Sequence, residues 1–98
     1  MNEWTNSAAE IVAAFAREHN LAPIIGQKTR GNVLGAANFS VGNGYWLRLP
    51  VFGWFTSTGK SVEGTGVSPD VDVQTSLPEL QRQHDTQLTR ATAVAEGF

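Results

Sequence analysis

The sequence predicts an α/β fold in which a mixed sheet lies against an N-terminal helix and a C-terminal helix. Three observations predict it. Apolar residues recur at helical spacing near the N-terminus, apolar and alternating runs fill the middle of the chain, and a second capped helical pattern follows Gln74. A length of 98 residues suits a single domain over 1–98 and is too short for two.

The first helix is expected over residues 7–19. Its apolar side chains recur at a spacing that places them on one face: Ala8, Ile11, Val12 and Phe15. Residues 22–25, with the sequence APII, are typical of a short buried strand, which favours parallel neighbours on both sides. Residues 26–38 contain three glycines and no clear period, which indicates a long loop.

A hairpin is expected next. Residues 39–50 alternate around the sequence GNG at 42–44, and Asn-Gly supplies the positive-φ positions that a tight turn requires. Residues 51–73 continue as a strand, a turn at 57–60 and an extended tail.

Beyond Gln74 the chain predicts a C-terminal helix. Thr75 or Ser76 can cap it, Pro78 stands near its first turn, and the sequence QHD at 83–85 is expected to split it in two.

The composition excludes several classes of function. Seven Lys and Arg against nine Asp and Glu give a net charge of −2, which argues against a nucleic-acid partner. The absence of cysteine excludes disulfides, thiolate metal sites and a Cys nucleophile. No apolar stretch approaches the ~20 residues of a membrane span. We expect no cofactor and no metal, because the lone pair Asp70 and Asp72 suits turn capping better than metal binding. The sequence does not indicate a cellular compartment.

Ser7 admits two interpretations. Ser7 and Glu10 form the pattern S-x-x-E of a capping box, which predicts a helix cap. The same place at a helix N-terminus offers free N–H groups to a developing oxyanion, so Ser7 can also be a nucleophile if a base reaches it.

The candidate bases within the chain are weak ones. His19 lies at the far end of the same helix, roughly 18 Å from Ser7 by the helical rise, and cannot reach. His84 is expected to be a solvated surface residue, and Lys28 an exposed residue of the glycine-rich loop. Glu63, flanked by glycine, is on spacing alone an ordinary loop carboxylate.

Three blocks of the sequence resemble the C-terminal half of the catalytic domain in the tail-specific (C-terminal processing) and tricorn-like serine proteases. NSAAEI at 6–11 resembles the nucleophile box, and IIGQKTRGN at 24–32 resembles a strand running into G-x-x-T-x-G. STGKSVEGTGVSPDVDV at 57–73 resembles the segment that ends in G-x-G-[IV]-x-P-D. The resemblance covers about residues 4–73 and implies a fragment of a ClpP/crotonase-like protease core.

The resemblance implies a role for each matching residue. Ser7 falls on the nucleophile, and the Ala8 amide on one oxyanion donor. One branch of the family has a lysine where this chain has Asn32. The tricorn-like branch uses a histidine from an upstream segment and a glutamate at the position of Glu63, so the pattern implies a Ser–His–Glu relay. The histidine would precede this chain, which is then expected to be inactive alone.

Three functions therefore stay open from the sequence. The first is the nucleophile-bearing part of a serine endopeptidase that cleaves unfolded or C-terminal segments through an acyl-enzyme. The second is a non-catalytic relative that binds peptides or other ligands, which Asn32 motivates. The third is a small self-associating domain in which Ser7 is only a cap. A fragment would leave apolar faces uncovered, so we expect a homo-oligomer that covers residues such as Ile24, Ile25, Trp46 and Trp54.

Overall fold

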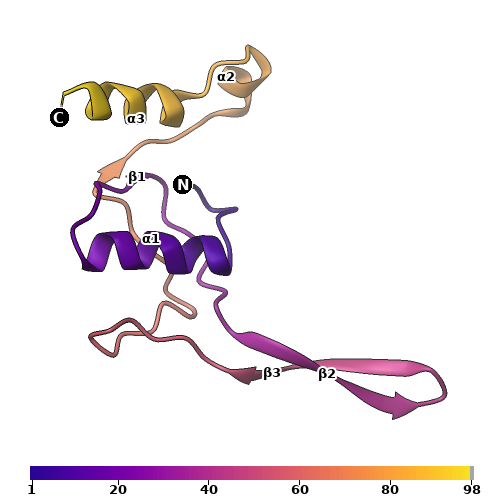
Figure 1. The fold of residues 1–98 in the computed structure, drawn as a ribbon. Coiled ribbons are helices and arrows are strands. Elements are labelled where there is room, and N and C mark those ends of the chain that lie inside the picture. The colour runs from indigo at the N-terminus through magenta and orange to yellow at the C-terminus, as the bar shows by residue number, and fades with distance from the viewer. Residues whose placement is uncertain (98) are drawn as a thin grey trace.

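The computed structural model describes residues 1–97, and it contains both helices and strands (Figure 1). The elements follow in the order α1 (Ala8–Glu18), β1 (Ile25–Gly26), β2 (Gly35–Gly42), β3 (Tyr45–Phe52), β4 (Val71–Asp72), α2 (Leu77–Gln81) and α3 (Thr86–Glu96). The predicted mixture of helix and sheet is confirmed. None of the helices within 1–97 combines the length and the hydropathy that a bilayer crossing requires.

The strands differ from the single mixed sheet that the sequence predicts. In residues 1–97, β1 and β4 form a parallel pair, and β2 and β3 form a separate antiparallel pair. Figure 1 shows the reason: the hairpin extends away from the rest of the chain, so its edges do not reach β1.

β1 is shorter than the predicted strand and begins later, at Ile25. The side chain of Asp70 accepts the Ile24 N–H at 2.8 Å, so that donor is taken before the ladder begins. On the edge of β1 away from β4, the Met1 amino group donates to the Ile25 carbonyl at 2.8 Å, and the Gln27 N–H donates to the Met1 carbonyl at 3.0 Å. This alternation is that of a parallel ladder. Met1 is not part of a strand, however, so within residues 1–97 β4 is the one strand that pairs with β1, and the parallel strand expected on the other side is not found.

The hairpin is confirmed, and it is longer than predicted. Asn43 and Gly44 have φ of 54° and 79°, the positive values of a type I′ turn. β2 begins at Gly35, because the small residues Ala36 and Ala37 pair with Pro50 and Leu49 of β3. The predicted loop therefore ends four residues early.

The buried core is small and lies beneath α1. Its members are aliphatic residues of α1, of the loop between β1 and β2 and of the segment between β3 and β4: Ala14, Val33, Val62 and Val67. The radius of gyration is 16.9 Å, well above the value of about 13 Å for a compact domain of this length. The extended hairpin accounts for much of this difference.

The C-terminal segment forms two helices, with the break where the sequence predicts it. Ser76 caps α2, and the Asp85 carboxylate accepts the Leu88 N–H at 2.9 Å as the cap of α3. Gln87 of α3 donates to the Val73 carbonyl at 2.9 Å and to the Gln27 side chain at 3.1 Å, which ties α3 to the parallel pair.

Among the residues expected to lie on uncovered apolar faces, the structure separates two groups. Ile24 is buried, which corrects the prediction for this residue, and Trp54 packs partly buried against the core. Trp46 is 68% exposed. One face of the hairpin is apolar: Ala37 lies opposite Leu49 and Phe39 opposite Leu47, and Phe39, Leu47 and Leu49 are exposed.

Self-association of the chain stays a prediction, and this hairpin face gives it a test. A second copy that covers the face would bury Leu47, and burying a leucine contributes about 2 kcal/mol. We expect Leu47→Gln to weaken the dimer by at least about tenfold in sedimentation equilibrium. Ser40→Gln, on the opposite face, is the matched control. A wild-type chain that stays monomeric at all concentrations would contradict the prediction.

Candidate active site

Ser7 stands at the start of α1 in a backbone conformation that an ordinary helix cap does not adopt. Its φ of 53° and ψ of −120° lie outside the extended region where N-cap residues sit. The Glu10 carboxylate accepts the Ser7 N–H, which is one half of a capping box, but the Ser7 hydroxyl makes no capping hydrogen bond. The Glu10 N–H donates to the Ser7 carbonyl instead, at 2.9 Å. The hydroxyl of this exposed residue is left available.

The backbone of Ser7 is held from two directions. Its N–H donates to the Asn32 carbonyl at 3.1 Å and to the Glu10 carboxylate at 3.1 Å. The next N–H, that of Ala8, has no hydrogen-bond partner within residues 1–97. A free first-turn N–H beside a free hydroxyl is the arrangement that oxyanion stabilisation requires.

Glu10 is the fully buried carboxylate of the site, with none of its surface exposed. Besides the Ser7 N–H, it accepts the Gly31 N–H at 2.5 Å and the Asn32 N–H at 2.9 Å. Burial by itself raises the pKa of the Glu10 carboxyl. Hydrogen bonds from the Thr29 side chain and from the three backbone N–H groups outweigh it, so the pKa lies below its ordinary value of 4.5. Glu10 thus joins the start of α1 to the loop after β1.

The loop after β1 and the segment before β4 interlock. The Thr29 N–H donates to the Val67 carbonyl at 3.0 Å, and the Val67 N–H donates to the Thr29 hydroxyl at 2.7 Å. The two segments approach so closely that a Cβ on Gly31 would lie 2.7 Å from the Gly66 nitrogen, and one on Gly66 would overlap the Thr29 carbonyl. Glycine is required at both positions, since φ is also positive there. These contacts bring the second and third sequence blocks together.

Glu63 lies on the third block, and its carboxylate accepts the Val33 N–H at 2.6 Å. Ser7 is bound to Asn32, the residue before Val33, so the structure brings Ser7 and Glu63 to adjacent residues of one loop. No hydrogen bond links the two side chains within 1–97. Glu63 keeps its second carboxylate oxygen without a partner among these residues.

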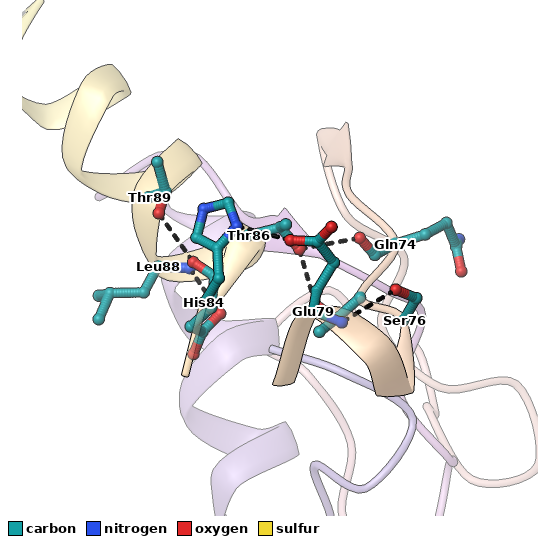
Figure 2. A network of polar contacts seen from close by, with 9 residues as sticks. Gln74, Ser76, Glu79, His84, Thr86, Leu88 and Thr89 are labelled. Carbon is teal, nitrogen blue, oxygen red and sulfur yellow. Dashed lines mark hydrogen bonds and ion pairs between the residues drawn. The ribbon is translucent and has the colours of Figure 1, made fainter. Parts of the chain in front are cut away.

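The histidines and Lys28 do not reach Ser7. His19 is at the C-terminal end of α1, where its ring lies 4.4 Å from that of Phe15. His84 lies between α2 and α3, and its Nδ1 is 2.6 Å from the Glu79 carboxylate (Figure 2). Lys28 is exposed. The placements expected for all three residues are confirmed.

Asp70 and Asp72, near β4, both make contacts within the fold. Asp70 caps the Ile24 N–H and lies 3.7 Å from the Arg17 guanidinium, and Asp72 accepts from the Gln74 side chain at 3.0 Å. Within residues 1–97 no three His, Asp or Glu side chains converge as metal ligands would.

Glu18 fixes the turn that follows the hairpin, a contact that sequence reasoning did not find. Its carboxylate accepts the Thr58 hydroxyl at 2.6 Å, the Thr58 N–H at 2.9 Å and the Ser57 N–H at 3.1 Å. The Thr58 hydroxyl is the main cause, together with the Thr58 N–H, of a pKa of Glu18 lowered to about 2. The residue anchors the segment that leads to Glu63 onto the same helix that carries Ser7.

Comparison with known proteins identifies the family of the chain. Residues 1–73 match the family model of peptidase family S41. The chain therefore belongs to peptidase family S41, and the resemblance seen in the three sequence blocks is confirmed. Among its relatives, the carboxy-terminal-processing protease of Bartonella bacilliformis is 34% identical over 88 residues, which are 90% of this chain and 20% of the relative. Tricorn protease homolog 1 of Streptomyces coelicolor is 31% identical over 96% of this chain and 9% of its own length.

Solved structures of two proteases are similar to the fold of this chain. A crystal structure of the tricorn protease superposes with a TM-score of 0.82 and 30% identity, covering 97% of this chain and 10% of that chain. The photosystem II D1 C-terminal processing protease superposes with a TM-score of 0.68 and 29% identity, covering 74% and 19%. This chain spans a fifth or less of the length of these relatives.

Glu10→Gln tests the buried carboxylate. An amide would turn an N–H donor toward backbone donors, and we expect the free energy of unfolding to fall by about 2–3 kcal/mol. Because the pKa of Glu10 is lowered by folding, its contribution is complete above pH 4.5 and falls as the pH drops below that value. Urea unfolding measures both effects. Glu96→Gln, on an exposed residue of α3, is the control, and an equal loss in both variants would contradict this role.

The Glu18 anchor predicts an unusual titration. The carboxylate holds the turn only while it is ionised, so the turn is expected to persist as the pH falls through 4.5 and to open near pH 2. The amide NMR shifts of Ser57 and Thr58 report the transition. A midpoint near 4.5 would show that the anchor does not form.

Proposed function

We propose that this chain carries the nucleophile of a serine-type peptidase that cleaves unfolded or C-terminal peptide segments through an acyl-enzyme. Ser7 is the nucleophile, the Ala8 N–H is one oxyanion donor, and Glu63 orients the general base. The observation that carries the proposal is the conformation of Ser7, whose backbone is fixed while its hydroxyl makes no capping bond. Membership of a peptidase family and relatives named as processing proteases support it.

The conformation of Ser7 favours a catalytic role over a capping role. A positive φ costs a non-glycine residue about 1–3 kcal/mol and persists where surrounding contacts impose it. Those contacts are the bonds from the Ser7 N–H to Asn32 and Glu10. A simple cap would gain more stability from extended backbone and a bonded hydroxyl.

The chemistry follows from these positions. The Ser7 hydroxyl attacks the carbonyl carbon of the scissile bond while a general base takes its proton, and the carbonyl oxygen becomes an oxyanion near the Ala8 N–H. The base returns the proton to the leaving amine, and water then hydrolyses the acyl-enzyme. The free oxygen of Glu63 suits a hydrogen bond to an imidazole N–H, which would fix the tautomer of the base.

The general base is assigned to a residue outside 1–98. His19 lies at the far end of α1 and His84 between α2 and α3, while Lys28 is exposed and no hydrogen bond joins it to Ser7 within residues 1–97. The 98-residue chain by itself is therefore expected to be inactive, because a serine without a base is a poor nucleophile. The catalytic core of the parent would have the ClpP/crotonase-like arrangement that the resemblance implies.

Asn32 supports a second candidate, a relative that binds peptides without cleaving them. It occupies the position where one branch of the family has its lysine, and its N–H and carbonyl are used to bind Glu10 and Ser7.

The test uses the longest protein encoded by the reading frame that contains residues 1–98. We expect a fluorophosphonate to label Ser7 and the protein to cleave a fluorogenic peptide. Ser7→Ala should abolish labelling and lower kcat by at least about 10³-fold. Glu63→Gln should lower kcat by about 10²–10⁴-fold with little change in KM.

Ser68→Ala, on an exposed serine of the same segment whose side chain makes no hydrogen bond within residues 1–97, is the matched control and should retain activity. Cleavage that survives Ser7→Ala would contradict the proposal. Peptide binding without labelling or cleavage would favour the second candidate.

A further inference from the structure

An exposed arginine is held in a fixed position beside the site, and the proposed mechanism does not use it. The Arg30 guanidinium lies over the ring of Trp4, with its central carbon 4.9 Å from the ring centroid. Trp4 is three residues before Ser7, and Arg30 is two residues before Asn32, whose carbonyl binds the Ser7 N–H. Both residues therefore stand on the segments that position Ser7.

The segment that carries Trp4 is itself rigid. The Asn2 side chain accepts the Trp4 N–H at 2.9 Å, the Asn2 carbonyl accepts the Thr5 N–H at 3.0 Å, and the Thr5 hydroxyl accepts the Asn2 N–H at 3.0 Å. These three bonds close a turn over residues 2–5. The ring of Trp4 stays 70% exposed and is presented as a flat support.

The segment that carries Arg30 is equally fixed. The residues after it donate their N–H groups to the buried Glu10 carboxylate, and the residue before it is locked to Val67. The backbone on both sides of Arg30 is thus immobilised, and the stacking on Trp4 limits the side chain. The entropy that a flexible arginine loses on binding a ligand is already lost here.

The Arg30 guanidinium has no carboxylate partner within residues 1–97. The ion pairs that these residues form involve Arg17, His19 and His84. The acidic residues nearest in sequence to Trp4 are Glu3 and Glu10. Glu3 is exposed and forms no ion pair, and Glu10 is buried and bound to backbone N–H groups. Five N–H donors in a planar fork are therefore free toward solvent, a geometry that matches a carboxylate.

The geometry points to a carboxylate-binding subsite made of Arg30 and Trp4 beside Ser7, which takes a carboxylate of the peptide substrate. This inference rests on the proposed peptidase function, because it assigns the pair to substrate binding. The carboxylate is either the free C-terminus of the peptide or an Asp or Glu side chain. Arg30 pairs with it through two parallel N–H···O bonds, and Trp4 keeps the guanidinium plane in place.

Binding of short peptides to the 98-residue chain tests the subsite without any need for catalysis. Four labelled apolar hexapeptides are used: a free acid, its C-terminal amide, an amide with one internal Asp, and the same amide with Asn. Fluorescence anisotropy up to millimolar chain measures each Kd. We expect the peptides with a carboxylate to bind about tenfold more tightly than their neutral partners. Preference for the free acid identifies the C-terminus as the source, and preference for Asp identifies a side chain.

Arg30→Gln should reduce this preference to less than twofold. Lys28→Gln removes the same charge from an exposed residue of the same loop and should leave the preference unchanged. Arg30→Lys keeps the charge without the planar fork, so we expect an intermediate preference. Trp4→Leu should weaken the preference by several-fold through loss of the aromatic support.

Two results would overturn the subsite: equal effects of Arg30→Gln and Lys28→Gln, or no binding of any carboxylate peptide by the wild-type chain. The peptidase proposal fails separately, through absence of Ser7 labelling in the longer protein. Carboxylate binding that depends on Arg30 without such labelling would keep the subsite and assign it to the peptide-binding alternative.

Discussion

The structure depends on one buried carboxylate. Glu10 has no contact with solvent, and it is held in its ionised form by N–H groups from the start of its own helix and from the loop after β1. The cost of burying a charge is met here by hydrogen bonds rather than by a cation. Because the same carboxylate binds Ser7 and Asn32, the helix start and the loop cannot move independently. This junction holds Ser7 against the loop to which Glu63 is also bound.

The three sequence blocks that carry the family resemblance are explained by how they touch. Thr29 exchanges hydrogen bonds with Val67, and the Gly31 carbonyl accepts the Gly64 N–H. Gly31 and Gly66 approach so closely that neither position has room for a side chain. Each block therefore packs against another block. A change in one block would therefore need a compensating change in the block that it contacts.

Local patterns predicted local structure well. The helix α1, the Asn-Gly turn of the hairpin and the Ser76 cap each depend on residues close in sequence, and these predictions are confirmed. The apolar face predicted for α1 is wrong in part, because Val12 and Phe15 are 69% and 51% exposed. The pairing of strands was harder, because β1 is only two residues long and its neighbours are distant in the sequence. A mixed sheet was expected, and the hairpin instead forms a sheet of its own.

The site shows the same division. The capping pattern identified Glu10 as a partner of Ser7, but no local signal showed that its other oxygen would bind Gly31. No pattern in the sequence singles out Glu18 or Arg30, because their partners Thr58 and Trp4 are distant in sequence. A charged residue becomes informative only when its contacts are known. The sequence positions of Ser7 and Glu63, by contrast, followed from a family pattern that composition alone does not reveal.

The left-handed backbone at position 7 has a consequence for engineering this chain. Glycine adopts such a conformation at little cost, whereas serine bears a penalty there. Selection for heat resistance alone would therefore favour glycine at this position and discard the hydroxyl. Thermal tolerance and chemistry are opposed at a single residue, so a screen that ranks variants by melting temperature would steadily remove the group that gives the chain its proposed purpose.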